Sequence, residues 1–460
     1  MNHEDTLRRW RGSRRTAKGC EGGPQSVGCR GKELSTKGSM NSRGSPTHTR
    51  RQVLTAGALG LASMGRPSLT GGRPDSEAAS SGGPRAGARS GAFPVLQPGT
   101  AAEVGMSAAR LGRIADRLRE ETSRGGVGSA SILVARHARV VLQQGFGGLN
   151  RGPGAPATRP DTLYIVASIS KPVSVCGLML LVDEGRVTLS DRVQRYLPEF
   201  QGRRKERVLV RHLLSHTSGL PDMVPENTQL RRAHAPLSEF VAAALRTPLL
   251  FEPGTRFSYQ SMGTLLAAEI AERVSGMRLR DLLRSRIFQP LGMQHTMLGL
   301  QGPTVEETAI FQENGNSEDS RRWGPNSPYW RAMGHPWGGL HATAGDLGVL
   351  LQTFLNGGGY GEARVFSPAT VAAMTRDQNG DLGAPWGYGW ALRDSPVWNY
   401  FGDLGTAGTF GHVGITGTVA WADPGRQLIC VLLSTRTAAH EDGFLLKSVS
   451  NLAQAAVVGT

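Results

Sequence analysis

Apolar residues near the start of the chain's ordered part fall into two spacings. In residues 107–121, apolar residues recur every three or four positions after Ser107, an N-cap candidate, and this spacing predicts a helix. Two short β-branched runs, 131–135 and 139–144, are joined by a tight polar link and predict a β-hairpin. The pattern thus places a helix directly before a pair of strands.

From about Asp161 to Leu300 the pattern is mostly helical. Residues 171–184 are apolar nearly all round, which predicts a buried helix that ends at Gly185. Residues 312–328 are polar and irregular and indicate a surface loop or lid. Amphipathic or apolar spacing predicts further helices at 237–245, 262–274, 279–288 and 344–355.

Towards the C-terminus the period returns to two. Strands are predicted at 416–422 and 427–434, on either side of the turn Asp423-Pro424-Gly425. A final helix places four apolar residues on one face: Leu445, Val449, Leu452 and Ala456. Strands at both ends with helices between them predict an α/β fold of the α+β kind. Its antiparallel sheet is built from both chain ends and flanked by terminal helices, and a mostly helical subdomain is inserted at about 161–330.

Charge and cysteine content narrow the class of protein. The net charge of +15 is concentrated in residues 1–90, which hold 16 basic and 6 acidic residues, so the remaining chain is near balance. No nucleic-acid-binding motif accompanies the basic excess, and we expect no nucleic-acid partner. The four cysteines do not form a disulfide framework; Cys176 and Cys430 lie in apolar runs and are expected to be buried. No spacing suggests a metal site or a cofactor, and no apolar run reaches the roughly 18 residues of a membrane span.

The basic N-terminal segment is interpreted as an export signal. Arg50-Arg51 precede a short, mildly apolar stretch that ends near Met64, a pattern that resembles a twin-arginine export signal. The alternative is an ordinary basic tail rich in Ala and Gly. We therefore predict a leader at 1–64, a disordered Gly/Ser/Pro/Arg linker at 65–98 and a single domain at 99–460, exported to the periplasm or the cell exterior. Translation from Met40 would place the arginine pair about ten residues from the N-terminus, a usual distance for such signals.

Candidate chemistry begins with Ser168 and Lys171, which lie one helical turn apart. Only 6 of the 52 basic residues are lysine, and a desolvated lysine can become a base whereas arginine cannot. Two other segments carry unusual residues. Residues 257–263 (FSYQSMG) place Tyr259 just before a helix, and 410–418 (FGHVGITGT) surround His412 with glycines that permit a substrate to approach the strand.

These three segments together resemble the serine β-lactamase-like hydrolases, which include class C β-lactamases, D-alanyl-D-alanine carboxypeptidases and related esterases. The likeness extends over residues 100–455. Three further landmarks occur in that family's order: 210–221 (VRHLLSHTSGLP), 287–293 (IFQPLGM) and 338–347 (GGLHATAGDL). The resemblance implies a β-lactamase/transpeptidase-like fold and a reaction through an acyl-serine intermediate.

The resemblance also implies roles for individual residues. Ser168 would be the nucleophile, Lys171 would accept its proton or position the acceptor, and Tyr259 would pass a proton to the leaving group. The backbone N–H groups of Ser168 and Ile415 would form the oxyanion hole. Substrate-binding positions would be Ser261, His412 and Gly414. The chemistry requires perturbed groups, so we expect burial to lower the pKa of the lysine and the lysine cation to lower the pKa of the tyrosine.

Two departures from the family pattern bear on the substrate. Many relatives have Asn where this chain has Ser261, so the carboxamide that would grip an acylamide side chain is missing. The lactamase pattern has Lys where this chain has His412, which offers no fixed charge for a carboxylate. Both changes favour an esterase or D-peptidase acting on a small ester or peptide, including a cell-wall peptide, over a β-lactamase. Other interpretations stay open: Ser261 as a helix cap, His412 as a structural histidine, or the whole chain as a penicillin-binding-like module without turnover. His216 and His341 are interpreted as structural loop histidines.

Overall fold

A computed structural model describes residues 92–312 and 318–459 of the chain. Its main sheet has seven strands in the order β1-β3-β2-β12-β11-β10-β9. All neighbouring strands are antiparallel except β1 and β3. The strands are β1 (Gln97–Pro98), β2 (Ser129–Arg136), β3 (Arg139–Gly147), β9 (Ala391–Leu392), β10 (Phe410–Gly414), β11 (Thr418–Asp423) and β12 (Leu428–Ser434). The sheet is thus built from both ends of the chain, as predicted.

Strands β2 and β12 join the two ends. They pair from Leu428 opposite Arg136 to Ser434 opposite Ala130. Ile132 and Val134 face a cluster formed with helices α2 (Ala108–Ser123) and α14 (Phe444–Ala455), whereas Leu133 faces the opposite cluster. This alternation follows from the period of two in a strand. Both helices were predicted, and Ser107 caps α2 by accepting a hydrogen bond from Arg110 N–H.

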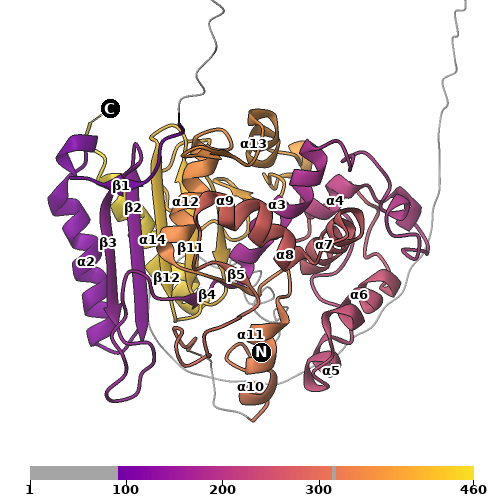
Figure 1. Cartoon of the computed structure of the whole chain (residues 1–460), viewed down its shortest axis with the longest axis horizontal. Helices are drawn as coiled ribbons and strands as arrows, with labels where there is room; N and C mark the ends of the chain where they lie inside the picture. Colours follow the sequence, from indigo (N-terminus) through magenta and orange to yellow (C-terminus); the bar gives the residue numbers. More distant parts are fainter. Residues whose placement is uncertain (1–91, 313–317, 460) are drawn as a thin grey trace, which may run out of the picture. The chain divides into compact units, whose positions relative to one another are not determined.

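The opposite face of the sheet is covered by α12 (Ala344–Leu355) and by the helical part of the chain (Figure 1). Its helices are α3 (Ser170–Asp183), α4 (Val210–Leu214), α5 (Asn227–Arg232), α6 (Leu237–Arg246), α7 (Ser261–Ser275), α8 (Leu279–Leu283), α9 (Gln289–Leu291), α10 (Glu318–Trp323), α11 (Pro328–Met333) and α13 (Pro368–Thr375). Two small sheets complete the body, β4 (Tyr164–Ile165) with β6 (Leu340–Ala342) and β5 (Met297–Leu298), and β7 (Gly359–Tyr360) with β8 (Ala363–Arg364). Short 3-10 turns lie at η1 (Ala102–Val104), η2 (Ala167–Ile169), η3 (Val193–Arg195), η4 (Lys205–Arg207), η6 (Gly380–Leu382) and η7 (His440–Gly443).

Three segments differ from the sequence predictions. The expected helix at 279–288 is α8 followed by a π-helical turn, η5 (Arg284–Phe288). The stretch 312–328, predicted to be irregular, contains helix α10. Residues 93–98, assigned to the linker, pair with the body, because Phe93 N–H donates to Gly361 O and β1 joins the sheet. The apolar residues that enter this contact, Phe93, Val95 and Leu96, interrupt the Gly/Ser-rich composition on which the linker boundary was placed. The predicted leader lies outside the described residues.

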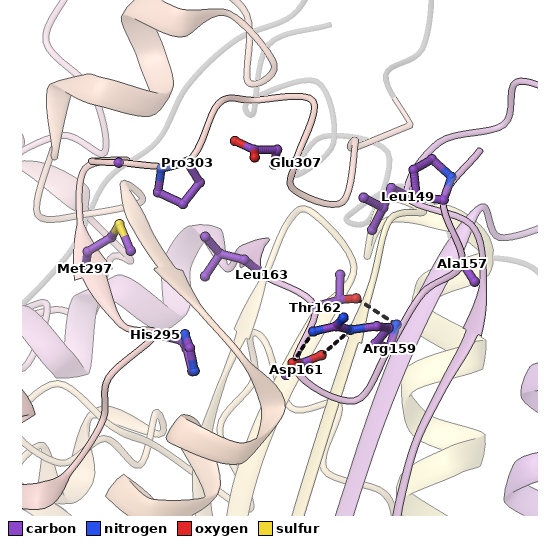
Figure 2. Close-up of a pocket in the computed structure, with 12 residues that line it drawn as sticks. Leu149, Ala157, Arg159, Asp161, Thr162, Leu163, His295, Met297, Pro303 and Glu307 are labelled. Atoms are coloured by element: carbon purple, nitrogen blue, oxygen red, sulfur yellow. Dashed lines mark hydrogen bonds and ion pairs between the residues drawn. The ribbon is translucent and has the colours of Figure 1, made fainter. Parts of the chain in front are cut away.

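A cavity of about 510 Å³ opens between the loop that follows β3 and the segment around β5 (Figure 2). Arg159 and Asp161 form an ion pair in its wall, near Thr162, and His295 and Glu307 line it from the other segment. None of the predicted site residues lines this cavity. No helix among the described residues is both long and apolar enough to cross a membrane.

Candidate active site

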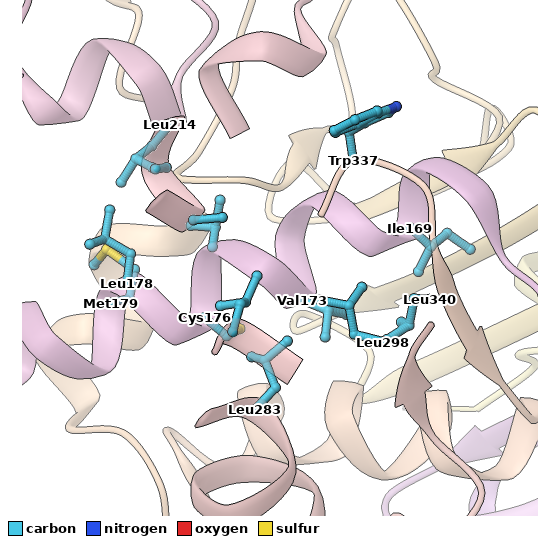
Figure 3. Close-up of a cluster of buried hydrophobic side chains, with 14 of the residues drawn as sticks. Ile169, Val173, Cys176, Leu178, Met179, Leu214, Leu283, Leu298, Trp337 and Leu340 are labelled. Carbon is cyan, nitrogen blue, oxygen red and sulfur yellow. The ribbon is translucent and has the colours of Figure 1, made fainter. Parts of the chain in front are cut away.

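Ser168 lies just before helix α3, most of which is buried. Every residue from 170 to 181 is buried, and Val173 and Cys176 pack among leucines of the neighbouring segments (Figure 3). Ser168 itself is half-buried in the turn η2 that precedes α3. Ala167, the residue before it, has a φ of 44°, a left-handed conformation that is strained for alanine. The turn therefore lifts the predicted nucleophile out of the core at the N-terminal end of the helix.

Lys171 lies directly beside the nucleophile. Its Nζ donates hydrogen bonds to Ser168 Oγ at 3.0 Å and to the Trp337 carbonyl oxygen at 3.1 Å. The side chain is 1% exposed. This burial lowers the pKa of Lys171 to about 8, although the nearby Asp222 carboxylate opposes the shift. The prediction that burial lowers the pKa of this lysine is confirmed.

The segment 335–340 is fastened to α3 and forms the wall behind Lys171. Ser174 Oγ donates to the Pro336 carbonyl oxygen at 2.8 Å, and Ser170 Oγ accepts from Leu340 N–H at 2.9 Å. Serines inside a helix usually bond to their own helix backbone. Ser170 Oγ does donate to the Ala167 carbonyl oxygen, but both serines also hold the segment whose Trp337 carbonyl binds Lys171. Helix α3 thus fixes both the lysine and its partner.

Tyr259 directly precedes Gln260, the N-cap residue of helix α7, and its side chain extends into the site. A hydrogen bond joins its hydroxyl to that of Ser168, and Lys171 Nζ lies 4.7 Å from the centre of its ring. The pKa of Tyr259 is raised well above its usual value, first by burial and also by the negative charge of Asp222. The expectation that Lys171 lowers this pKa is therefore wrong. Loss of hydration is the largest cause of the raised Tyr259 pKa, and the Asp222 carboxylate acts in the same direction.

The turn after β10 brings the third segment to the nucleophile. Thr416 Oγ1 donates to the Ile165 carbonyl oxygen at 2.8 Å, and Thr418 Oγ1 donates to that of Val166 at 3.1 Å. These two hydroxyls hold the turn that contains Ile415 against the residues just before Ser168. A Cβ added to Gly414 would lie 2.2 Å from the Val166 carbonyl oxygen, so this close approach requires glycine.

His412 is buried beside the same group of residues. Its ring centre lies 6.1 Å from that of Tyr259, and its Nδ1 is 2.8 Å from the Val413 carbonyl oxygen. Burial, with Lys171 as the second cause, lowers the pKa of His412 to about 3. The imidazole is therefore neutral at neutral pH, as the sequence predicted for a histidine in place of a lysine.

Ser261 does not cap the following helix. The N-cap of α7 is Gln260, and Ser261 is the first helical residue. Its Oγ donates to Asp222 Oδ1 at 2.7 Å and its backbone N–H donates to the same oxygen at 2.8 Å. The carboxylate of Asp222 thus accepts hydrogen bonds from the first residue of α7. The N-terminal end of a helix is a favourable place for a negative charge.

Sequence reasoning missed two contributors to the site. Asp222 follows the HTSGLP landmark by one residue, and that position was the available signal. The Trp337 contact uses a backbone carbonyl and leaves no sequence signal. His216, interpreted as a structural loop histidine, lies in the turn after α4, and its ring packs against Tyr259 with centres 4.7 Å apart. His341, expected in a loop, lies in strand β6.

No cluster of three or more potential metal ligands occurs among residues 92–312 and 318–459. The site as described contains a hydroxyl nucleophile, a lysine with a lowered pKa and a neutral tyrosine in mutual contact. Such an arrangement can form and release an ester of the serine.

Comparison with known proteins gives a consistent result. Residues 97–454 match the family model described as Beta-lactamase. A putative D-alanyl-D-alanine carboxypeptidase of Escherichia coli (strain K12) is 30% identical over 75% of this chain and 86% of its own length. A penicillin-binding protein homologue from Caulobacter crescentus is 27% identical with a TM-score of 0.62 and covers 76% of this chain and 99% of its own. A family VIII carboxylesterase, 24% identical with a TM-score of 0.61 over 75% of this chain and 98% of its own, shares the fold.

Proposed function

Because the chain belongs to the β-lactamase family of serine hydrolases, we propose that it cleaves an ester or a peptide-like amide through a covalent acyl-Ser168 intermediate. The observation that carries the proposal is the 3.0 Å hydrogen bond from Lys171 Nζ to Ser168 Oγ, made by a buried lysine whose pKa is lowered to about 8. A neutral lysine in this position can accept the hydroxyl proton as the serine attacks.

The proposed reaction has two steps. Ser168 Oγ forms a bond to the substrate carbonyl carbon while its proton passes to Lys171 Nζ, and the N–H groups of Ser168 and Ile415 stabilise the negative charge on the carbonyl oxygen. The bond to the leaving group then breaks, and the leaving group takes the proton through the Tyr259 hydroxyl, which is neutral because its pKa is raised. Water releases the acyl group by the same route in reverse.

One labelling experiment tests this proposal against its alternatives. The folded body and its Ser168→Ala variant are incubated with a fluorophosphonate probe, a fluorescent penicillin and a short p-nitrophenyl ester. We expect fluorophosphonate labelling and ester turnover that both require Ser168. Penicillin labelling that persists for hours without ester turnover would indicate a penicillin-binding module, and rapid penicillin hydrolysis would indicate a β-lactamase.

Lys171→Arg tests the role of the lysine as a base. Arginine keeps the charge but does not lose its proton at working pH, so we expect activity to fall at least a hundredfold. Lys447→Arg makes the same change at a half-buried position where Nζ lies 4.9 Å from the Tyr400 ring, outside the site, and is expected to leave activity unchanged. A Lys171→Arg variant within tenfold of the wild type would show that deprotonation is not needed.

Export is part of the proposal and rests on Arg50-Arg51, which lie outside the described residues. Mass spectrometry of the protein isolated from its native host would determine the mature N-terminus. We expect cleavage after the apolar stretch that follows the arginine pair, and an intact N-terminus at Met1 would contradict both export and the Met40 start.

A further inference from the structure

Ser261 and His412, two of the predicted substrate-binding residues, share one chemical property. Ser261 Oγ uses its hydrogen in the 2.7 Å bond to Asp222 Oδ1. A carboxylate has no hydrogen to give back, so Ser261 can offer its neighbours only lone pairs. The residue that replaces the family's asparagine is therefore a hydrogen-bond acceptor, whereas a carboxamide would have provided two N–H donors as well.

His412 has the same property. Its Nδ1 lies 2.8 Å from the Val413 carbonyl oxygen, which only accepts, so Nδ1 carries the hydrogen of the neutral ring and Nε2 carries a lone pair. The ring is fully buried, and Nε2 has no hydrogen-bond partner in the described part of the chain. A buried acceptor without a partner is costly, and a donor on a bound molecule would remove that cost.

Asp222 adds a negative charge to this environment. Its carboxylate is held beside the site by Ser261 and acts electrostatically on both Lys171 and Tyr259. The lysine that the lactamase pattern places at position 412 is a neutral histidine here, and Asp222 supplies an acidic group beside Ser261. A substrate carboxylate at this place would face lone pairs and a like charge.

We propose that this end of the site recognises an amine or ammonium group next to the scissile bond, so that the preferred substrates are α-aminoacyl esters or amides with a free amine. The substrate N–H groups would donate to Ser261 Oγ and His412 Nε2, and Asp222 would attract the positive charge. This inference rests on the proposed hydrolase function and assigns its substrate class.

Three p-nitroanilides test the inference with the same leaving group. Alanine p-nitroanilide carries the free amine, isobutyryl p-nitroanilide replaces that amine by a methyl group, and N-succinyl-alanine p-nitroanilide carries a carboxylate. We expect kcat/KM for the free amine to exceed that of isobutyryl at least tenfold, with the succinyl compound the poorest. The corresponding primary amides, tested as inhibitors of p-nitrophenyl butyrate hydrolysis, should follow the same order.

Asp222→Asn keeps an oxygen for Ser261 but removes the charge. We expect the ratio of kcat/KM for alanine over isobutyryl p-nitroanilide to fall at least fivefold. The ratio cancels any change in Lys171, because both substrates use the same nucleophile and base. Glu226→Gln removes a charge from an exposed residue of the same loop and is expected to leave the ratio unchanged.

Two outcomes would overturn the inference while leaving the hydrolase function intact. One is Ser168-dependent activity that treats isobutyryl or succinyl compounds as well as the free amine, as substrates or as inhibitors. The other is an Asp222→Asn variant with the wild-type ratio. If instead no substrate, including p-nitrophenyl butyrate, is turned over in a Ser168-dependent way, the proposed function itself fails.

Discussion

At the scale of single residues, the candidate site holds two titratable groups whose pKa values are shifted in opposite directions. Burial lowers the pKa of Lys171 and raises that of Tyr259, so one loses its proton readily and the other keeps it. Both shifts favour the uncharged form of a group removed from water. This shared cause supports the proposal that Lys171 is the base and Tyr259 the neutral relay.

The pH dependence of kcat/KM reports the lysine. Because the base must be neutral, we expect activity on p-nitrophenyl butyrate to rise with pH and to level off above a midpoint near the Lys171 pKa of about 8. Asp222 opposes the lowering of this pKa, so Asp222→Asn should move the midpoint to lower pH. Initial rates between pH 6 and pH 10 check both statements, and a midpoint that moves upward would contradict the assignment.

The burial of Lys171 also lowers the free energy of unfolding of the protein. The pKa of Lys171 falls from about 10.4 in an unfolded chain to about 8 in the fold, which corresponds to roughly 3 kcal/mol below pH 8. The cost is fully present below the folded pKa and disappears as pH rises through the unfolded one. Lys171→Met removes this titrating group. The free energy of unfolding of the variant, relative to that of the wild type, should therefore be highest near pH 7 and should fall towards pH 10.5. Urea unfolding at both pH values measures the change, and a pH-independent difference would refute it.

At the scale of elements, the turn after β10 decides the geometry of the proposed oxyanion hole. Two threonine hydroxyls fasten it to the residues before Ser168, and Gly414 permits the close contact. These contacts hold the turn that contains Ile415 beside the residues that precede Ser168, although the two segments lie far apart in the sequence.

Gly414→Ala tests this support. The added Cβ would meet the Val166 carbonyl oxygen at 2.2 Å, so the backbone must move and we expect kcat to fall at least a hundredfold while the fold persists. Circular dichroism and ester turnover distinguish the two effects. Gly112→Ala is the matched control, because its Cβ would meet nothing within 4 Å in helix α2 and should stabilise the protein by about 0.5–1 kcal/mol.

Elements with a long periodic pattern were predictable, and those created by tertiary contacts were not. Helix α12 matches its prediction because apolar spacing and the cap at Thr343 act locally. Helix α10 was missed because its sequence has no apolar stripe; its contacts with α5 include an exposed ion pair between Arg232 and Asp319 at 2.7 Å. Ser168 and Lys171 were evident from spacing, whereas Asp222 enters the site through Ser261, which is 39 residues away.

At the scale of the whole molecule, Arg136 ties the ends of the body together. This buried side chain donates to the carbonyl oxygens of Val104 at 2.6 Å, Gly459 at 2.7 Å and Arg426 at 3.1 Å. The backbone adds a contact from Ser107 N–H to Ala456 O at 2.7 Å. One guanidinium thus joins the start of the body, its last residues and the β11–β12 turn.

Arg136→Ala should destabilise the entire body and not one end of it. Several charge-assisted hydrogen bonds are lost, and the buried Val104 carbonyl loses its bond to the guanidinium, so we expect a loss of roughly 2–4 kcal/mol in the free energy of unfolding. Arg119→Ala removes only the exposed pair with Asp116 and should change stability by less than about 0.5 kcal/mol. Thermal unfolding of both variants, followed together with activity, measures the difference. A variant that keeps wild-type stability would show that the two ends hold without Arg136.

The pairing of β2 with β12 also determines when the main sheet can form during synthesis of the chain. Leu428 leaves the ribosome roughly 290 residues after its partner Arg136, which at about 5–20 residues per second leaves β2 without that neighbour for roughly 15–60 s. Ser168, Lys171 and Tyr259 are all synthesised in the first half of this interval, whereas β10 and Ile415 are synthesised only near its end. A ribosome-bound chain that stops before residue 410 would therefore carry the nucleophile, base and relay and still be inactive. Activity would begin only when the last strands are released.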